Sequence, residues 1–273
     1  MSVDRPQAPT AARVAPASDY DTFVDWAKRL EREAPFFRRV FEEHGAHRVL
    51  DVGCGSGKHA LMWAGWGLDV VGADPDDSML AQAEANRLQE LASVEAAGGS
   101  IAFAKMGFGD LASSGLGSFD ALTCTGNALP HVAGHAGLRE ALDDFAAVLR
   151  PGGVLVLHLL NHDRLLAQHV RAIPPVVRET EEGTRVFLRV IDYADDAILF
   201  DFITMQRPAD AWSTGAAWDV ASRRSPHTAL PGEVLLPALE AAGFGDVVRY
   251  GNHAGAPFDA AKDESVIVVA VRR

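Results

Sequence analysis

The chain has 273 residues, 48% of them hydrophobic, and a formal net charge of −12. These values fit a globular protein with one large domain, or a core that carries an insertion. The acidic balance disfavours a nucleic-acid partner, because phosphate backbones bind basic surfaces. No apolar run approaches the roughly 18 to 20 residues of a membrane-spanning helix, so we expect no membrane partner. The two cysteines, Cys54 and Cys124, and the lack of a secretory signal pattern favour the cytoplasm.

Residues 1–17 are rich in Pro, Ala and polar residues, and this composition predicts a mobile N-terminus. From Phe23 to Phe41 apolar residues recur at helical spacing, and Pro35 predicts a break between two helices. These helices begin a core that we expect over residues 18–169.

Strand patterns alternate with helical patterns from residue 48 onward. The predicted strands are residues 48–52, 70–74, 101–104, 119–124 and 154–159. Residues 229–273 return to the core with a helix (230–242) and two strands (246–250, 266–271). The alternation predicts an α/β fold, a doubly wound Rossmann-like sheet of seven mostly parallel strands. Ligands of such sheets bind at the carboxyl ends of the strands, near the point where strand order reverses.

Residues 170–228 interrupt this rhythm and predict a strand-rich lid. Residues 185–192 and 197–205 alternate apolar and polar positions, and Asp195-Asp196 between them is a turn signal, so we expect a hairpin. Residues 209–226 show no clear period.

The run DVGCGSGK at residues 51–58 is a strand followed by a glycine turn. A P-loop would need Ser or Thr after Lys58, where His59 stands. A dinucleotide fingerprint beginning at Gly53 would place its third glycine at position 58. The observed spacing, acid-x-G-x-G-x-G, fits neither motif.

This spacing is the first motif of class I S-adenosylmethionine (SAM)-dependent methyltransferases, which the stretch resembles. Residues 125–132 (TGNALPHV) resemble the G-N-S-x-x-H-[LV] segment of glycine N-methyltransferase and its bacterial small-molecule relatives. Residues 150–156 and 258–265 also match this group. The resemblance covers residues 19 to 165 best, and it implies SAM as cofactor and S-adenosyl-L-homocysteine as product.

Asp74 ends the second predicted strand, where a carboxylate can accept hydrogen bonds from both hydroxyls of a ribose. An acid that interacts with the dipole of the following helix is the alternative. Met106 and Phe108 follow the third strand and could enclose an adenine. The resemblance implies that Arg29 pairs with the cofactor carboxylate, with an ordinary helix-surface arginine as the alternative. The predicted cofactor-binding residues are Arg29, Gly53, Cys54, Gly55, Asp74, Pro75, Met79, Met106, Gly107, Phe108, Thr125, Gly126 and Asn127.

Methyl transfer is an in-line displacement, so the protein must position the nucleophile and exclude water. A neutral amine needs no strong base, whereas a hydroxyl benefits from one, and histidine is the usual choice. His131 is the predicted catalytic residue because it lies in a motif that lines the cofactor. Tyr20 loosely resembles a family tyrosine near the methyl group. Methylation of nitrogen and of oxygen both remain open.

In glycine N-methyltransferase an arginine after the fifth strand binds the glycine carboxylate, and the aligned residue here is Leu160. The missing guanidinium disfavours glycine as the acceptor and favours a bulkier, more apolar small molecule, such as a natural-product intermediate. The predicted acceptor-lining residues are Leu160, His162, Trp212, Trp218 and His227. The two tryptophans could equally be packing residues of the lid.

The sequence therefore predicts a SAM-dependent methyltransferase that acts on N or O of a small molecule, as a monomer or homodimer and without a metal. Two alternatives remain open. One is an NAD-dependent oxidoreductase, which would also use a glycine turn and Asp74. The other is a SAM-binding regulatory protein without catalysis.

Overall fold

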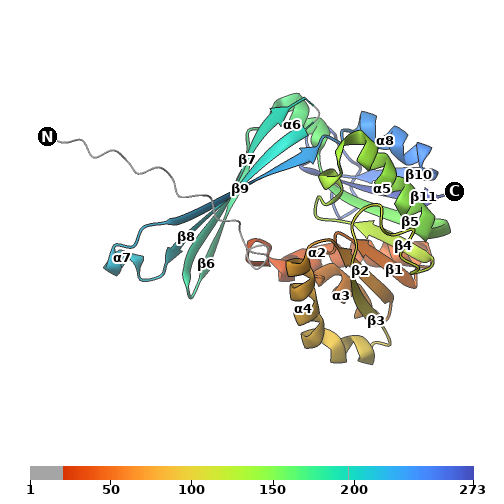
Figure 1. Ribbon diagram of the computed structural model, residues 1–273, viewed down its shortest axis with the longest axis horizontal. Coiled ribbons are helices and arrows are strands. Elements are labelled where there is room, and N and C mark those ends of the chain that lie inside the picture. Colours follow the sequence, from red (N-terminus) through yellow and green to blue (C-terminus); the bar gives the residue numbers. More distant parts are fainter. Residues whose placement is uncertain (1–20, 196) are drawn as a thin grey trace.

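Two β-sheets form the framework of the computed structural model, which describes residues 21–195 and 197–273 (Figure 1). The first sheet has seven strands in the order β10-β11-β5-β4-β1-β2-β3, and the second has four in the order β6-β7-β8-β9. The strands of the seven-stranded sheet are β1 (Arg48–Val52), β2 (Asp69–Asp74), β3 (Ser100–Lys105), β4 (Phe119–Cys124), β5 (Leu149–Leu160), β10 (Phe244–Tyr250) and β11 (Ser265–Arg272).

Strands β1 to β5 are parallel, and β11 and β10 close the sheet in antiparallel pairing. Strand order reverses between β1 and β4. The prediction of a doubly wound, mostly parallel seven-stranded sheet is confirmed. The carboxyl ends of β1, β2 and β4 therefore lie at one edge, at the reversal point where ligands of such sheets bind.

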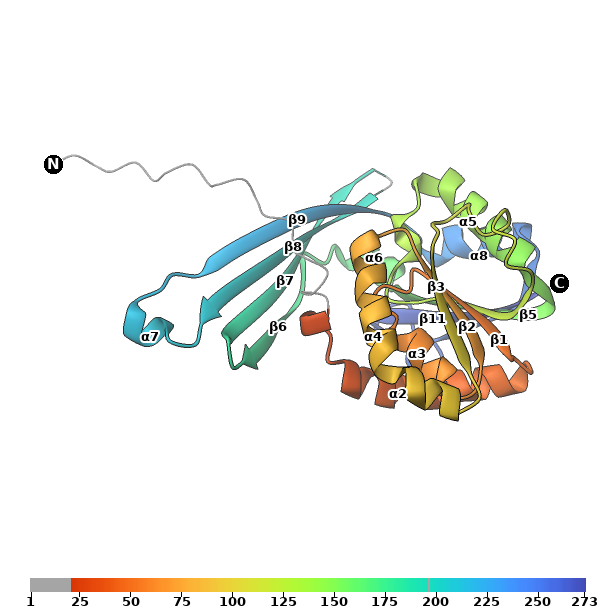
Figure 2. The same ribbon diagram turned by 60° about the horizontal axis from the view of Figure 1, so that its bottom comes forward.

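Helices cover both faces of this sheet (Figure 2). The helices α2 (Trp26–Glu43), α3 (Lys58–Ala64) and α4 (Asp77–Ala96) share one apolar cluster with the strands, in which Phe37 and Trp63 are fully buried. The helices α5 (Gly134–Val148) and α8 (Gly232–Ala241) pack on the other face through Leu142 and Leu239. The two clusters together bury nearly all apolar residues of β1, β2, β4 and β5, which is why these strands read as apolar runs in the sequence. The edge strand β3 is only partly buried.

The second sheet is formed by β6 (Ala172–Thr180), β7 (Gly183–Ala194), β8 (Ala197–Pro208) and β9 (Asp219–Thr228), all antiparallel. The predicted hairpin is present as β7 and β8. The sheet extends away from the core, with the short helix α7 (Ala211–Thr214) at its far end, and β9 runs back to the core beside the short helix η1 (Leu129–His131) (Figures 1 and 2). We call this sheet the lid sheet.

One face of the lid sheet, here called the inner face, contacts the core. It carries Phe187, Phe200 and His227, since paired residues and every second residue along a strand share a face. The helix α6 (His162–Gln168) connects β5 to β6, and its Leu165 packs with Phe200 on this face. The prediction of a core over residues 18–169 and 229–273 with a lid over 170–228 remains a prediction.

The expected helix break at Pro35 is wrong, because α2 continues through it from Trp26 to Glu43. Proline removes only one helical N–H, and this residue is exposed. Its neighbours Phe36 and Phe37 are at most 1% exposed, so their packing holds the helix together across the missing hydrogen bond.

The expected start of the fifth strand at residue 154 is also wrong, because β5 begins at Leu149 and includes the Pro151-Gly152-Gly153 run. Phe119 pairs with Leu149 and Ala121 with Val154, so these extra residues form an irregularity opposite β4. The predicted mobile segment at residues 1–17 and Tyr20 lie outside the described residues. Across the described ranges, no helix combines the length and apolar character needed to cross a membrane.

The loop after β3 is held by a single buried carboxylate. Asp144 of α5 is 6% exposed and accepts backbone N–H groups from Gly109, Leu111 and Ala112 at 2.7–3.0 Å. A carboxylate that accepts several amide hydrogen bonds fixes a loop more strongly than a neutral acceptor does. The shape of the loop thus depends on the helix behind it.

Replacing Asp144 with alanine should lower the free energy of unfolding by about 2 kcal/mol, because three N–H groups lose a charged acceptor. Urea unfolding followed by circular dichroism measures this change. Asp143→Ala is the matched control, since Asp143 is the exposed neighbour on the same helix. Equal stability of the two variants would show that Asp144 does not hold the loop.

Candidate cofactor and acceptor site

The loop between β1 and α3, here called the glycine loop, requires glycine at positions 53, 55 and 57. Gly53, Gly55 and Gly57 have φ values of 71°, 55° and 75°, a region that other residues rarely adopt. A Cβ on Gly53 would lie 2.7 Å from the Cβ of Ala128, and one on Gly57 would lie 2.5 Å from the ring of Phe103. The loop can therefore pass close to the ends of β3 and β4 only with bare backbone.

A buried carboxylate lies directly before this loop. Asp51 is 1% exposed, and the Thr123 hydroxyl donates to its Oδ1 at 2.8 Å. Burial raises the pKa of Asp51 to about 7, the Thr123 hydrogen bond opposes this shift, and the nearby Asp74 carboxylate adds to it. Two acidic side chains thus meet near the carboxyl ends of β1 and β2.

Asp74 fastens the glycine loop to β2. Its Oδ2 accepts the N–H of Gly55 at 2.9 Å, and its Oδ1 accepts the N–H of Asp76 at 2.9 Å. Burial raises the pKa of Asp74, and these two backbone hydrogen bonds oppose that shift. Each carboxylate oxygen can accept a further hydrogen bond, so the side chain can still receive two hydroxyl groups. Helix α4 begins with its own cap, Asp76, so Asp74 does not cap this helix. Interaction of Asp74 with the dipole of α4 stays open as the alternative to ribose binding.

The residues predicted for the adenine side form the loop that Asp144 holds. Met106 is 9% exposed, and its N–H donates to the Asp74 carbonyl at 3.3 Å. The Gly107 N–H donates to the Asp110 carboxylate at 2.8 Å. A Cβ built on Gly107 would lie 3.7 Å from the Cβ of Pro75, so these two residues are in contact distance. Phe108 leans on Phe145 of α5, with ring centres 5.8 Å apart. Pro75 and the 106–108 loop are therefore brought together beside Asp74.

An amide in the segment after β4 connects the core to the lid sheet. Asn127 has φ of 66°, and its Oδ1 accepts the N–H of Leu160 at 2.9 Å. Its Nδ2 lies 3.2 Å from Nδ1 of His227 on β9, which therefore accepts the amide proton. The sequence predicted Asn127 and His227 as separate site residues, and the structure makes them partners.

His131 joins this pair. Its ring centre lies 4.3 Å from that of His227. Burial, and then the neighbouring His131, lower the pKa of His227 to about 3. Burial and the charge of Arg223 also lower the pKa of His131. Both rings are therefore neutral at physiological pH, and they form a polar patch between the core and the lid sheet.

Arg29 is not a surface arginine, since its side chain is only 14% exposed. Its Nε lies 3.1 Å from Oε1 of Glu33, and His59 contacts the other oxygen of Glu33 at 2.8 Å. The proposed pairing of Arg29 with a cofactor carboxylate remains a prediction, and the structure gives Arg29 a buried protein partner.

A contact that the sequence did not reveal closes the segment before α2 over the glycine loop. Asp21 accepts a hydrogen bond from the Ser56 hydroxyl at 2.6 Å and another from Trp26 Nε1 at 2.8 Å. The only signal in the sequence is an acid five residues before a tryptophan, which is too common to predict a contact.

The other predicted acceptor-lining residues lie in different parts of the structure. Leu160 packs against the apolar cluster of the inner lid face. His162 is 1% exposed and accepts the N–H of Leu230 at 2.9 Å, so it joins α6 to the residues that follow β9. Trp218 is 37% exposed and lies beside Arg207, between α7 and the start of β9, so the structure does not bring it to the other predicted acceptor-lining residues. The side chain of Trp212 lies outside the described residues.

The two cysteines are free, and burial raises the pKa of both thiols well above the usual range. They remain protonated and are poor nucleophiles. Within residues 21–195 and 197–273, no cluster of three His, Cys, Asp or Glu side chains could hold a metal ion.

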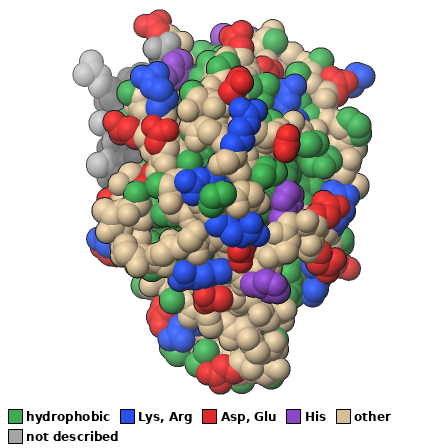
Figure 3. Space-filling model, turned by 90° about the vertical axis from the view of Figure 1, so that its right-hand side faces the viewer, with side chains coloured by type: hydrophobic (Ala, Val, Ile, Leu, Met, Phe, Trp, Pro, Cys, Tyr) green, Lys and Arg blue, Asp and Glu red, His purple; other side chains and the backbone are tan. Residues whose placement is uncertain are grey.

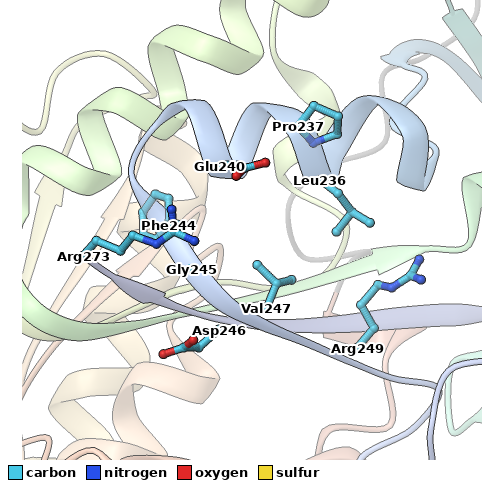
Figure 4. A pocket seen from close by; sticks show the side chains of 9 residues that line it. All are labelled: Leu236, Pro237, Glu240, Phe244, Gly245, Asp246, Val247, Arg249 and Arg273. Carbon is cyan, nitrogen blue, oxygen red and sulfur yellow. The ribbon is translucent and has the colours of Figure 1, made fainter.

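A hollow of about 480 Å³ lies between α8 and β10, lined partly by Leu236, Asp246 and Arg273 (Figure 4). Arg273 follows the end of β11, and near that end Val271 pairs with Val154 in the amino-terminal half of β5. The hollow is therefore at the edge of the sheet opposite the glycine loop, and it contains no candidate site residue. On this side of the molecule basic and acidic side chains are interleaved (Figure 3).

Comparison with known proteins identifies the domain around the glycine loop. Residues 49–153 match the family model described as a methyltransferase domain. Over 147 residues the chain is 37% identical to a glycine/sarcosine N-methyltransferase of Parasynechococcus marenigrum (strain WH8102), which covers 54% of this chain and 50% of the relative. The chain thus spans about half the length of the curated relatives that it matches.

Solved structures extend the similarity to the whole fold. A SAM-dependent methyltransferase from Clostridium acetobutylicum ATCC 824 superposes with a TM-score of 0.73 at 16% identity, over 94% of this chain and 97% of that one. The sugar N-methyltransferase KedS8 from Streptoalloteichus sp. ATCC 53650 gives 0.71 at 23% identity, over 100% and 99%. The comparisons confirm the resemblance to class I SAM-dependent methyltransferases and the Rossmann-like fold with a strand-rich addition, and SAM is the cofactor of this class.

Asp51→Asn should remove a pH dependence of stability. The carboxyl titrates near 7 in the folded protein and near 4 when unfolded. Its stabilising contribution is therefore complete below pH 4 and disappears as the pH rises through 7. Between pH 6 and 8 the wild-type protein should lose about 1 kcal/mol that the variant keeps. Urea unfolding at both pH values measures this, with Asp143→Asn as control. An equal difference between variant and wild type at both pH values would contradict the raised pKa.

Asp74→Ala should weaken SAM binding by about 10- to 100-fold, since the two charged hydrogen bonds predicted between this carboxylate and the ribose would be lost. Isothermal titration calorimetry measures the affinity directly. Asp77→Ala is the control, because that side chain is 77% exposed and binds only Lys105 in the structure. Unchanged affinity in the Asp74 variant would remove this residue from the site.

Proposed function

We propose that this chain, whose residues 49–153 match a methyltransferase domain, transfers a methyl group from SAM to a nitrogen atom of a small molecule of natural-product type. The observation that carries the proposal is the junction of Asp51, the glycine loop and Asp74 at the strand-order reversal. The curated relatives are named as N-methyltransferases of glycine and sarcosine, and KedS8 as a sugar N-methyltransferase.

The residues at this edge fit the parts of SAM. Gly53 and Gly55 bring bare backbone to the methionine part, Asp74 has lone pairs for two ribose hydroxyls, and Met106 and Phe108 flank the adenine. When bound, SAM supplies an electrophilic methyl group. The protein then has to hold an acceptor atom in line with that group and keep water away.

A cationic cofactor suits the charges of the site. Asp51 and Asp74 raise the local negative potential, and each is destabilised by its own burial. A sulfonium relieves this repulsion, whereas the pyrophosphate of a dinucleotide would increase it. The NAD-dependent alternative is disfavoured for this reason and by the position of the third glycine.

Nitrogen is the favoured acceptor atom because the two described histidines that we expect beside the acceptor, His131 and His227, are weak bases. His227 has a pKa of about 3, and the pKa of His131 is lowered as well. A hydroxyl acceptor would have to lose its proton to such a base, whereas a neutral amine attacks through its lone pair. We assign His131 and His227 to orienting the acceptor by hydrogen bonds. Tyr20, proposed near the methyl group, lies outside the described residues.

An acceptor screen with SAM labelled at the methyl group tests the function. Small amines and matched alcohols are incubated with the protein, and methylated products are detected by mass spectrometry. We expect N-methylated products from amines, none from the alcohols, and at least tenfold less product with Asp74→Ala at limiting SAM. Methylation of the alcohols alone would overturn the choice of nitrogen.

Two controls separate the alternatives. SAM and S-adenosylhomocysteine should raise the melting temperature and NADH should not, because only a ligand of the folded state stabilises it. SAM binding without turnover of any acceptor would favour the regulatory alternative. In the same assay, turnover by His131→Ala within about twofold of wild type at saturating SAM would contradict a role for His131.

A further inference from the structure

Two arginines flank a phenylalanine on the inner face of the lid sheet. Arg189 of β7 pairs with Phe202 of β8, and Phe202 pairs with Arg223 of β9, so the three side chains form one row on one face. The Arg223 guanidinium lies 5.4 Å from the centre of the Phe202 ring. The row therefore combines an aromatic surface with two positive charges.

Neither guanidinium has an acidic partner among the described residues. No carboxylate of residues 21–195 or 197–273 lies within 4 Å of Arg189 or Arg223, and the Nε of Arg189 is buried without a hydrogen bond. Arg189 leans instead on the Phe23 ring at 5.1 Å, and Glu264 attracts it only from a longer distance. Arg189 is partly buried, and a partly buried cation without a counter-ion is costly, whereas Arg223 is exposed and open to a ligand. Together the two arginines are suited to a ligand anion.

Two acids next to this row lie on the outer face of the lid sheet, and Asp219, on the inner face, pairs with Gln206 nearer the far end. Asp192 and Asp201 stand at positions that alternate with the row and so lie on the opposite, outer face. Asp201 binds Arg224 there at 2.6 Å. The chain has 37 acidic and 25 basic residues, so acids are the more common charged residues. The strand positions next to Arg189 and Arg223 on the inner face nevertheless carry none.

The row faces the candidate site. His227 lies on the same face as Arg223, four residues further along β9, and contacts Asn127 of the core. Four residues of a strand span about 13 Å. Phe187, also on this face, packs on Phe23 at 5.4 Å, close to the segment that covers the glycine loop. Arg223 is also close enough to Asp76, at the start of α4, to lower its pKa.

We propose that Arg189 and Arg223 bind an anionic group, a carboxylate or a phosphate, at the end of the acceptor remote from its nucleophilic nitrogen. The Phe202 ring packs against the acceptor body between the two guanidinium groups. This inference rests on the proposed function and names the acceptor class. In place of the carboxylate-binding arginine missing at Leu160, it assigns a pair of which Arg223 lies roughly 13 Å along β9 from His227, which suits an acceptor much longer than glycine.

Binding and turnover together test the proposal. The probes are three series of linear amines of matched length, about 8 to 14 Å, that end in a phosphate, a carboxylate or a hydroxyl group. We measure their affinity for the protein loaded with S-adenosylhomocysteine by calorimetry, and their kcat/KM for methylation. The phosphate or the carboxylate series should bind at least tenfold more tightly than the hydroxyl series, and the tighter of the two identifies the anion.

The variant Arg189→Gln/Arg223→Gln should abolish that preference, mainly through KM, and leave the affinity for SAM unchanged. Arg224→Gln is the matched control, because it removes an arginine from the outer face of the same strand, and it should keep the preference. Loss of SAM affinity in the double variant would assign the arginines to the cofactor and overturn the proposal, and so would equal binding of all three series.

Failure of the proposed function gives a different result. A protein that binds the anionic series through Arg189 and Arg223 but methylates none of the probes would keep this subsite and refute the methyl transfer. Methylation of all three series with no preference for a charged end would support the methyl transfer and refute the anion-binding subsite. Circular dichroism of the double variant checks that both outcomes come from folded protein.

Discussion

The hydrogen bond from the Gly55 N–H to the Asp74 carboxylate fixes the part of the structure on which the site depends. Gly53 and Cys54 add two bonds to the carbonyl oxygen of Ala73. These contacts fasten the glycine loop to the end of β2 before α3 begins. Bare backbone makes this possible, because a side chain on Gly53 would collide with the segment after β4. The positive φ angles and the three hydrogen bonds therefore depend on one another, and together they hold the glycine loop at the point where strand order reverses.

The same constraint brings carboxylates together in a poorly solvated place. Asp51 and Asp74 both have raised pKa values, for which burial is the main cause. A stable fold tolerates this only where other contacts hold the chain, and the buried apolar strands of the core provide them. Burial disfavours the ionised form of both carboxylates, and a positively charged ligand beside them would stabilise that form. The electrostatics of these two carboxylates thus favour the same cofactor class as the spacing of the glycines.

The core was predictable from sequence because each of its strands is a short apolar run between turn signals, and both sheet faces are covered by helices. The lid was predicted only in part. Strand β6 was missed because Pro174 and Pro175 argue against a strand, and the register shift between Ile173 and Val176 accommodates them. Strand β9 was missed because its polar residues show no clear period. The contact of Asn127 with His227 depends on where β9 returns to the core, which local patterns do not specify.

The glycine loop and the lid sheet are joined by the short segment before α2. Asp21 accepts a hydrogen bond from Ser56 of the glycine loop, and two residues later Phe23 packs on Phe187 of the lid sheet. Arg178 of β6 donates to the carbonyl oxygen of Phe23 at 3.0 Å. The chain itself joins the core to the lid sheet at its two edge strands, through α6 at β6 and directly at the end of β9. The contacts of residues 21–23 add a third connection, which reaches β6 and β7 on one side and the glycine loop on the other. One short segment thus packs against both the lid sheet and the glycine loop, two parts of the fold that are far apart in the sequence.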